Sequence, residues 1–318
     1  MIIGIHGLKN KPPKKILKRW WRTAIREGLE NIGHKDSSFR FELVYWAHFL
    51  HPQPQNPYVT DKEHPLFIQF PYTPSTLLKR KKPSEWRKRL LNKFEEEMDK
   101  IFFKKDMSTH FSGLALLIMR YFFRDLYIYY AKYAIGHDHE AHPAKQILRD
   151  HLARMIKKHH KKRIMLIAHS MGSIIAYDVL TQTIPDQKID TLITIGSPLG
   201  LPTIMGKFLA ELRTKVPRTP ENIAVNWFNF SDLDDKVAIN YNLADDYEEN
   251  SSHIHVIDKV VVNDYEHNGV KEPHASYGYL RTPELAEVVY EFLSRDRRRI
   301  QAVLCRVKSW FVRILRPL

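Results

Sequence analysis

The chain has 318 residues, of which 43% are apolar, and 50 Lys and Arg against 36 Asp and Glu give a formal net charge of +14. This length allows one large α/β domain or a domain with a substantial insertion, and the apolar fraction excludes wholesale disorder. The single cysteine, Cys305, excludes an intrachain disulfide and a cysteine-based metal site, and is typical of a reducing compartment.

The chain begins with MIIGIHG, an apolar stretch that predicts a buried strand directly after Met1. It has neither the basic start nor the small-residue cleavage site of a secretory signal peptide. The most apolar later run, 111–123, is interrupted by Arg120 and falls short of the ~18 residues that predict a membrane-spanning helix. We therefore expect a cytoplasmic protein without a transmembrane span.

Positive charge is spread over several basic runs rather than gathered in one module. The runs lie at 9–19, 77–89, 157–163 and 295–299. None has the motif or the interleaved aromatic residues of a nucleic-acid-binding module, so we expect no nucleic acid as partner. Attraction to anionic membrane surfaces or acidic substrates is the expectation, and a merely solvated basic surface is the alternative.

Strand and helix patterns alternate along most of the chain. A helical pattern follows Pro12 and Pro13, and 40–49 is rich in aromatic and β-favouring residues. Later strands are predicted at 163–170, 189–198 and 222–230, with helices at 144–158, 173–182 and 203–214. This alternation of apolar strands and helices predicts an α/β fold with a mostly parallel sheet flanked by helices.

The segment 51–140 interrupts the alternation after the second core strand. It opens with the proline-rich HPQPQNPYVTDKEHP and continues with predicted helices around 84–104 and 111–135. We interpret 51–140 as a helical insertion that forms a lid or cap, with a packing embellishment as the alternative. The core would then be discontinuous, made of 1–50 and 141–296.

The last segment, 297–318, has the pattern of a basic amphipathic helix. Apolar residues from Ile300 to Leu315 recur at steps of three and four, arginines fall between them, and Trp310 lies near the apolar face. Such a composition favours an interfacial membrane helix. The alternative is a terminal helix packed on the body of the protein or on a second subunit.

The stretch IMLIAHSMGS at 164–173 has the pattern of a nucleophile elbow. A buried strand enters, an apolar helix leaves, and the small residues Ala168 and Gly172 lie two positions before and after Ser170. Small residues are needed there because the tight turn brings strand and helix together. Serine is also a common N-cap residue, so Ser170 alone does not decide between a nucleophile and a cap.

Acids and histidines follow in the order that such an elbow requires. Three acids, Asp232, Asp234 and Asp235, come after the strand NWFNF, and we favour Asp235 because the apolar VAI follows it closely. Four histidines come later, at 253, 255, 267 and 274. His274 fits the base best, because it lies in a loop just before the closing helix that starts near Pro283.

An oxyanion hole needs two backbone N–H groups near the nucleophile. The residue after Ser170 is Met171, which is the expected first donor. The loop IHGL at 5–8 ends the first strand with a glycine, and Leu8 is the expected second donor.

In these residues the chain resembles the α/β-hydrolase superfamily, and within it lipase- and esterase-like serine hydrolases of the PGAP1-like or lecithin:cholesterol acyltransferase-like branch. The segments that carry the resemblance are IIGIHGL, LIAHSMGSIIAYDVL, LITIGSPLG, VNWFNFSDLDDKVA and PHASYGYL, which leave 51–140 uncovered. The resemblance implies the α/β-hydrolase fold and a triad of Ser170, Asp235 and His274. The chain departs from the usual pattern at Ala168, where glycine is usual.

The resemblance also implies Leu8 and Met171 as oxyanion donors, while the crowded acids leave Asp232 and Asp234 as alternatives to Asp235. No metal or other cofactor is expected, since HDHEAH at 137–142 has no second ligand cluster at a familiar spacing. We interpret HDHEAH as a solvated linker.

The sequence therefore predicts a serine hydrolase that cleaves a small-molecule or lipid carboxylic ester. One alternative is an acyltransferase that uses the same triad and an alcohol acceptor. The other is a catalytically silent binding protein, held at an anionic membrane surface by its C-terminal helix. The oligomeric state is left open.

Overall fold

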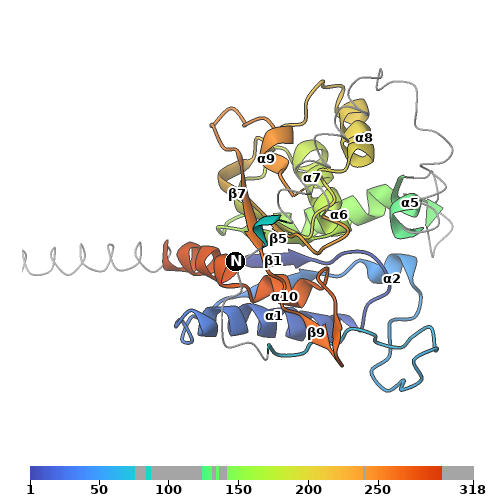
Figure 1. The fold of residues 1–318 in the computed structure, drawn as a ribbon. Helices are drawn as coiled ribbons and strands as arrows, with labels where there is room; N and C mark the ends of the chain where they lie inside the picture. The colour runs from blue at the N-terminus through green and yellow to red at the C-terminus, as the bar shows by residue number, and fades with distance from the viewer. Residues whose placement is uncertain (76–83, 87–123, 131–133, 136–141, 239–240, 296–318) are drawn as a thin grey trace, which may run out of the picture.

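The computed structural model describes residues 1–75, 84–86, 124–130, 134–135, 142–238 and 241–295 (Figure 1). Its centre is a six-stranded sheet in the order β2-β1-β5-β6-β7-β8, in which all neighbouring strands are parallel. The strands are β1 (Ile2–Ile5), β2 (Phe41–Val44), β5 (Met165–His169), β6 (Ile189–Ile195), β7 (Ile223–Asp232) and β8 (Val256–Val261). The predicted α/β fold with a parallel sheet is confirmed.

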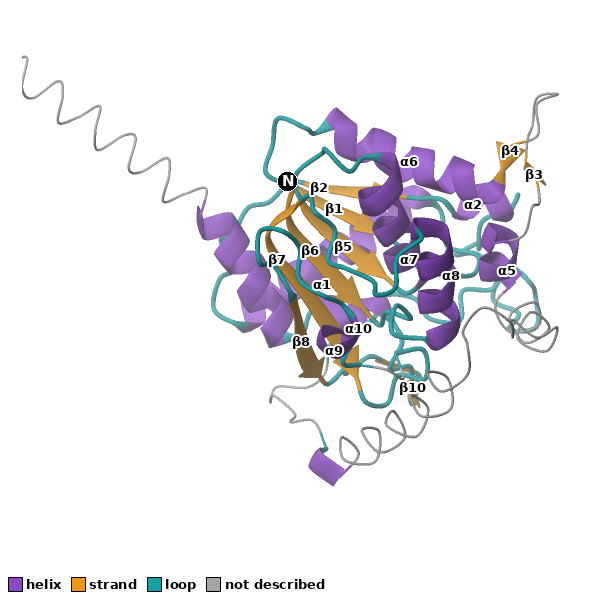
Figure 2. Cartoon of the chain, turned by 90° about the horizontal axis from the view of Figure 1, so that it is seen from above, coloured by secondary structure: helices purple, strands orange, loops and turns teal. Residues whose placement is uncertain are grey.

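Helices cover both faces of this sheet (Figures 1 and 2). One face carries α1 (Lys14–Asn31), α10 (Ser276–Leu280) and a helix over 283–295. The other carries α6 (Ala144–Lys158), α7 (Met171–Asp178) with the π-helical turn η1 (Val179–Thr183), α8 (Pro202–Leu212) and α9 (Leu243–Asp246). Smaller elements are α2 (Ala47–Leu50), α5 (Arg124–Tyr130), the pair β3 (Ala134–Ile135) and β4 (His142–Pro143), and the hairpin β9 (Glu266–His267) and β10 (Val270–Lys271).

Each face of the sheet has its own hydrophobic cluster, which explains why the strands read as continuous apolar runs. Every residue of β1 and of β5 is buried. Gly4 in β1 allows the α1 side chain Trp21 to pack directly on the strand, because a Cβ on Gly4 would lie 2.8 Å from the indole ring. Gly4 therefore leaves room on the α1 face of β1 for the indole ring of Trp21.

The chain changes direction across the sheet between β1 and β5. The connection after β1 runs through α1 to β2 on one side, whereas the connection after β5 runs through α7 to β6 on the other. Neighbouring strands whose connections diverge leave a crevice at their carboxyl ends, where ligands bind in open α/β sheets. Leu8 follows β1 and Ser170 follows β5, so both lie at this switch point.

The strand predicted over 40–49 is wrong in its second half. The ladder ends at Val44, and α2 begins at Ala47. The cause is a side-chain acceptor: His6 Nε2 accepts the Trp46 N–H at 3.0 Å, which takes this N–H out of the sheet. Periodicity does not reveal such a contact, since it joins residues forty positions apart.

The prediction of a helical lid at 51–140 falls largely outside the described residues. Within the described part, 51–75 has neither helix nor strand, and α5 lies inside the helix predicted at 111–135. The HDHEAH linker lies outside the described residues apart from its last histidine, and the amphipathic helix of 297–318 lies wholly outside them. These interpretations stay predictions.

The two described ends of the 51–140 segment are bound to the core on opposite faces of the sheet. On the α1 side, Arg281 Nη1 donates to the Thr73 carbonyl oxygen at 2.5 Å, and the Tyr72 hydroxyl donates to Glu27 at 2.7 Å. Arg281 is 3% exposed, so its contact with Thr73 is a buried one.

On the α7 side, the anchor is α5. The Tyr129 hydroxyl donates to Asp178 Oδ2 at 2.5 Å, and Lys145 Nζ lies 3.0 Å from the same oxygen. Asp178 belongs to the helix that follows Ser170, so α5 is fastened to the element that carries the serine. Among the described helices, none is long and apolar enough to cross a membrane.

Candidate active site

Ser170 lies at the turn between β5 and α7 in a strained backbone conformation. Its φ of 54° and ψ of −129° are unusual for a residue with a side chain, and conformations of this kind cost about 1–3 kcal/mol. Its backbone is fixed by hydrogen bonds: its N–H donates to the Ile195 carbonyl at 3.1 Å, and Ser173 donates to its carbonyl from both N–H and Oγ. The serine side chain makes no cap bond to α7, so it is available for other contacts.

Two glycines let neighbouring backbone approach this turn. A Cβ on Gly7 would lie 2.5 Å from the Cβ of Ser170, and a Cβ on Gly172 would lie 2.8 Å from the carbonyl oxygens of Ile5 and His6. A third glycine, Gly196, has a φ of +52° and lies against the Asp235 carboxylate and not against the serine turn. The strand-to-helix turn is therefore pressed against the loop after β1 with no space for a side chain between them.

Ala168, where glycine is usual, is fully buried in β5 and belongs to the hydrophobic cluster beneath α7. Its methyl group is thus accommodated by core packing, and the departure from the usual pattern leaves the turn intact.

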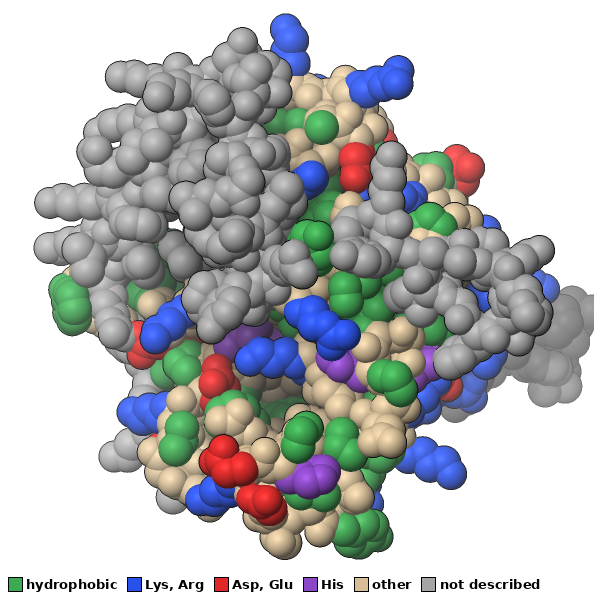
Figure 3. Space-filling model, turned by 90° about the vertical axis from the view of Figure 1, so that its right-hand side faces the viewer, with side chains coloured by type: hydrophobic (Ala, Val, Ile, Leu, Met, Phe, Trp, Pro, Cys, Tyr) green, Lys and Arg blue, Asp and Glu red, His purple; other side chains and the backbone are tan. Residues whose placement is uncertain are grey.

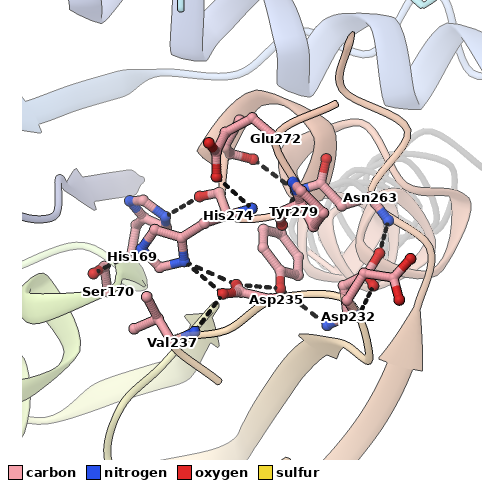
Figure 4. Close-up of polar contacts among 12 residues, drawn as sticks. His169, Ser170, Asp232, Asp235, Val237, Asn263, Glu272, His274 and Tyr279 are labelled. Atoms are coloured by element: carbon pink, nitrogen blue, oxygen red, sulfur yellow. Dashed lines mark hydrogen bonds and ion pairs between the residues drawn. The ribbon is translucent and has the colours of Figure 1, made fainter. Parts of the chain in front are cut away.

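His274 lies between Ser170 and Asp235 (Figure 4). Its Nε2 is 3.0 Å from Ser170 Oγ, and its Nδ1 is 2.8 Å from Asp235 Oδ2 and 3.0 Å from Oδ1. The Asp235 side chain is fully buried, and the imidazole is 24% exposed. The structure thus brings together the three residues that the sequence singled out as nucleophile, base and favoured acid.

The other two acids of the turn are placed differently. Asp232 accepts backbone N–H groups, from Asp234 at 2.7 Å and from Asn263 at 2.5 Å. It therefore ties the end of β7 to the loop that leaves β8. Asp234 is exposed. Neither carboxylate contacts the imidazole of His274, so the geometry distinguishes Asp235 from both alternatives.

Tyr279 of α10 joins the two buried acids. Its hydroxyl accepts the Asp232 N–H at 2.9 Å and donates to Asp235 Oδ2 at 2.8 Å. Burial, followed by the negative charges of Asp235 and Asp232, raises the pKa of this phenol well above its usual value, so it remains a donor. The sequence does not reveal this role of Tyr279, since nothing in SYGYL distinguishes it from Tyr277.

His169, the residue before the serine, holds the backbone of the base. Its Nε2–H donates to the His274 carbonyl at 2.9 Å, and the two imidazole rings lie 4.8 Å apart. Burial, then the proximity of His274, lowers the pKa of His169 well below the usual histidine value. A neutral His169 thus serves as a fixed donor rather than as a second base.

The two predicted oxyanion donors flank the nucleophile. Leu8 follows Gly7, whose backbone is pressed against the Ser170 side chain, and Met171 is the first residue of α7. In the part of the chain that the structure describes, neither N–H has an acceptor. Unpaired N–H groups beside a serine oxygen are what a developing oxyanion requires.

His6 fixes the loop that carries Leu8. Its Nε2 accepts the Trp46 N–H, so its Nδ1–H donates to the Gly7 carbonyl at 2.8 Å, and its ring stacks on the Trp46 indole at 4.7 Å. The Trp46 indole N–H donates a hydrogen bond to the His6 carbonyl oxygen at 2.8 Å. Burial, then the charge of Lys11, lowers the pKa of His6 well below its usual value, which keeps the ring neutral.

The loop after β1 and the 51–140 segment are in contact at Asp125 of α5. The Lys9 N–H donates to Asp125 Oδ2 at 2.6 Å, and His51 Nε2 lies 3.1 Å from Oδ1. Burial opposes ionisation of Asp125, but the bond and charge of His51 and the Lys9 N–H outweigh it and lower the pKa of this carboxyl. Among the described residues, no cluster of three His, Cys, Asp or Glu side chains suited to a metal ion is found.

Two comparisons with known proteins bear on this geometry. Residues 124–270 match the family model described as PGAP1-like alpha/beta domain. The match includes Ser170 and Asp235 and stops four residues before His274. No curated protein matches the chain significantly.

The matched region supports a hydrolase- or acyltransferase-type function in general terms. It agrees with the parallel sheet and with the strained serine turn at its switch point. The fold and this match support an α/β-hydrolase-like assignment, in which residues 124–270 are similar to a PGAP1-like alpha/beta domain.

Proposed function

We propose that the protein is a serine hydrolase that cleaves carboxylic esters through an acyl-enzyme intermediate. The observation that carries the proposal is the continuous contact from Ser170 Oγ to His274 at 3.0 Å and from His274 to Asp235 at 2.8 Å. Both separations lie in the hydrogen-bonding range expected of a nucleophile, its base and an orienting acid.

In the first half-reaction, Ser170 Oγ attacks the ester carbonyl carbon while its proton passes to His274 Nε2. The Asp235 carboxylate holds the imidazole in the Nδ1–H form and stabilises the imidazolium. The carbonyl oxygen becomes an oxyanion that accepts hydrogen bonds from the Leu8 and Met171 N–H groups. The carbon–oxygen bond to the alcohol then breaks, and His274 gives its proton to the departing alkoxide.

In the second half-reaction, water attacks the acyl-enzyme and His274 takes its proton. The bond between Ser170 Oγ and the acyl carbon breaks, the serine regains a proton from His274, and a carboxylic acid leaves. An alcohol that replaced water would give a new ester by the same steps, which is the acyltransferase alternative. The substrate is proposed to be a small-molecule or lipid ester. Contact with an anionic membrane through 297–318 and a cytoplasmic location also stay proposals.

The test is reaction with a fluorophosphonate probe, which forms a covalent bond with an activated serine. Wild-type protein should be labelled, Ser170→Ala should not, and Ser252→Ala should be labelled like wild type because Ser252 is an exposed serine outside the site. Hydrolysis of p-nitrophenyl butyrate should follow the labelling. A wild-type protein that is neither labelled nor active on such esters would overturn the proposal and favour the silent binding protein.

Product analysis separates hydrolase from acyltransferase. With a primary alcohol added to the ester assay, a hydrolase releases mainly the carboxylic acid. An acyltransferase releases mainly the new ester, and that result would replace the proposed reaction by its alternative.

A further inference from the structure

The loop after β1 holds an ammonium group with a single partner. Lys11 Nζ donates to the Leu8 carbonyl oxygen at 2.5 Å, and no other acceptor contacts it among the described residues. A lysine ammonium has three donors, so two of them have no partner in this part of the protein. No carboxylate of the described chain lies within ion-pair distance of it.

An ammonium group in this position is unfavourable without a counter-ion. The Lys11 side chain is only partly exposed, and burial together with the nearby charge of Lys9 lowers its pKa to about 8. Asp125 attracts it from a greater distance, but the oxygens of Asp125 already accept the Lys9 N–H and contact His51. The local charge balance is therefore incomplete.

Backbone hydrogen bonds fix the conformation of the loop at Lys11. Lys9 takes a left-handed conformation with φ 68°, which folds the loop back so that Lys11 reaches the Leu8 carbonyl. The Lys11 carbonyl accepts the Gln55 N–H at 2.9 Å, and the Lys11 N–H donates to Asn10 Oδ1 at 2.8 Å. The fixed backbone of the loop and the Leu8 carbonyl oxygen thus determine the position of the ammonium group.

The charge also lies close to the reacting groups. Leu8, whose carbonyl binds the ammonium, is the proposed oxyanion donor, and the Lys11 charge lowers the pKa of both His6 and His169. Figure 3 shows the face formed by the carboxyl ends of the strands, with Lys or Arg and His side chains next to one another at its centre. An anion bound to Lys11 would lie beside the ester bond.

We propose that Lys11 binds a negatively charged group, a carboxylate or a phosphate, carried by the ester substrate itself. This inference rests on the proposed esterase function and narrows its substrate class to anionic esters. The substrate anion supplies the counter-ion that the protein lacks and accepts the two unused N–H donors of Lys11. Lys11 is in this sense a residue that determines specificity, beside the groups that carry out the reaction.

Two matched pairs of esters test the proposal, because the charge can lie on either side of the reacting carbonyl. On the alcohol side the pair is 4-carboxyphenyl butyrate and 4-carbamoylphenyl butyrate, which differ in charge and little in shape. On the acyl side the pair is monophenyl adipate and its monoamide. The measured quantity is the ratio of kcat/KM between the anionic and the neutral ester of each pair, for wild type, Lys11→Met, Lys11→Arg and Lys15→Met.

In at least one pair, wild type should prefer the anionic ester, and Lys11→Met should lower the ratio about tenfold, mainly through a higher KM. Lys11→Arg should retain most of the preference, and Lys15→Met, which removes one exposed charge from α1, should leave it unchanged. Labelling of Lys11→Met by an uncharged fluorophosphonate shows that the site is still folded.

Equal ratios for wild type and Lys11→Met in both pairs would overturn the inference and leave the esterase function standing. Equal loss on both esters of a pair would do the same, since it would assign Lys11 to positioning the loop. Activation of the neutral esters by inorganic phosphate would also overturn it, because a separate anion would then occupy Lys11. Absence of hydrolysis of all four esters, with no labelling of wild type, would instead overturn the esterase function.

Discussion

Tyr279 orients the carboxylate of Asp235. The phenol donates to Asp235 Oδ2 at 2.8 Å while it accepts the Asp232 N–H at 2.9 Å, and its side chain is fully buried. Val237 N–H donates to the other oxygen, Oδ1, at 2.9 Å. With a donor on each oxygen, Asp235 can present its charge to His274 in only one orientation.

Replacing Tyr279 by Phe should therefore impair both catalysis and stability. We expect kcat/KM on a neutral ester to fall about tenfold, because a charge-assisted hydrogen bond to Asp235 is lost. The free energy of unfolding should fall by about 1–3 kcal/mol, since the buried Asp232 N–H loses its acceptor.

Tyr277→Phe is the matched control, because no hydrogen bond of the Tyr277 hydroxyl is found within the described residues. Ester kinetics and urea unfolding measure both effects. Equal behaviour of the Tyr279 and Tyr277 variants would refute the orienting role.

Replacing each of the three acids of the turn by asparagine should have a different effect on kcat and on stability. Asp235→Asn should lower kcat about 10⁴-fold, the size seen when a triad aspartate is neutralised in a serine protease. Asp232→Asn should mainly lower stability, because its carboxylate accepts the Asp234 and Asn263 N–H groups. Asp234→Asn should change kcat less than about twofold, since exposed surface substitutions have small effects. Kinetics combined with thermal unfolding distinguish the three, and a 10⁴-fold loss at Asp232 or Asp234 would reassign the acid.

Gly196→Ala should abolish activity through a steric contact. A Cβ there would lie 2.8 Å from Asp235 Oδ2 and 3.1 Å from His274 Nδ1, so the Asp235 carboxylate must shift from the position in which it contacts His274. Gly269→Ala is the control, because Gly269 also has a positive φ but has no atom within 4 Å of the added Cβ. Both variants should lose about 1 kcal/mol of stability from backbone strain, and only the first should lose esterase activity. An active Gly196→Ala would contradict the geometry.

Acid should destabilise the protein through its buried neutral histidines. Burial, then the charges of His48, Arg154 and Lys14, lowers the pKa of His151 to about 4. An unfolded histidine has a pKa of about 6.5, so as the pH falls from 6.5 to 4 the unfolded chain binds a proton that the folded chain does not. The free energy of unfolding then falls by up to about 1.4 kcal/mol per pH unit for this residue.

His151→Gln should reduce this slope, whereas His255→Gln, at an exposed histidine, should not. Urea unfolding at several pH values between 4 and 7.5 measures the slope. A free energy of unfolding that rises as the pH falls toward 4 would contradict this effect of the neutral histidines.

The preference for anionic esters should depend on the charge of Lys11. Its pKa of about 8 reflects burial and the charge of Lys9, opposed by Asp125, while burial lowers the pKa values of His6 and His169 so that both stay neutral. The anionic-to-neutral ratio of kcat/KM should therefore be constant at lower pH and fall as the pH rises through about 8. Ionisation of the reacting groups affects kcat/KM equally for both esters, so this effect cancels in the ratio. A ratio that is flat to pH 9.5 would show that Lys11 does not set the preference.

Much of the fold could be predicted because its signals are local. The runs that became β1, β5, β6 and β7 are rich in apolar residues, and the runs of β1 and β5 are apolar on both faces, which is the pattern of strands in a parallel sheet. The helix predicted at 144–158 has the bounds of α6, since its apolar spacing begins after Pro143. The serine turn was visible because small residues are needed at fixed offsets around Ser170.

The rest depends on contacts between residues far apart in the chain. The second strand was predicted too long because the acceptor that ends it, His6, is forty residues away. Three aspartates within four positions have the same local pattern, and only the loop that carries His274 and the phenol of Tyr279 distinguishes them. The single partner of Lys11 is likewise invisible in KNKPPKK, where every lysine appears equally solvated.

Because 104 positions separate Ser170 from His274, the parts of the candidate site become available at different times during synthesis. A ribosome completes the serine turn, with β5 and α7, well before it reaches the base. The acid at 235 and then the phenol at 279 also arrive late, so a nascent chain holds a strained serine that has no partner to remove its proton. On the proposed mechanism, the nascent chain would therefore lack hydrolase activity through most of its synthesis and would gain it only once α10 has packed beneath the sheet.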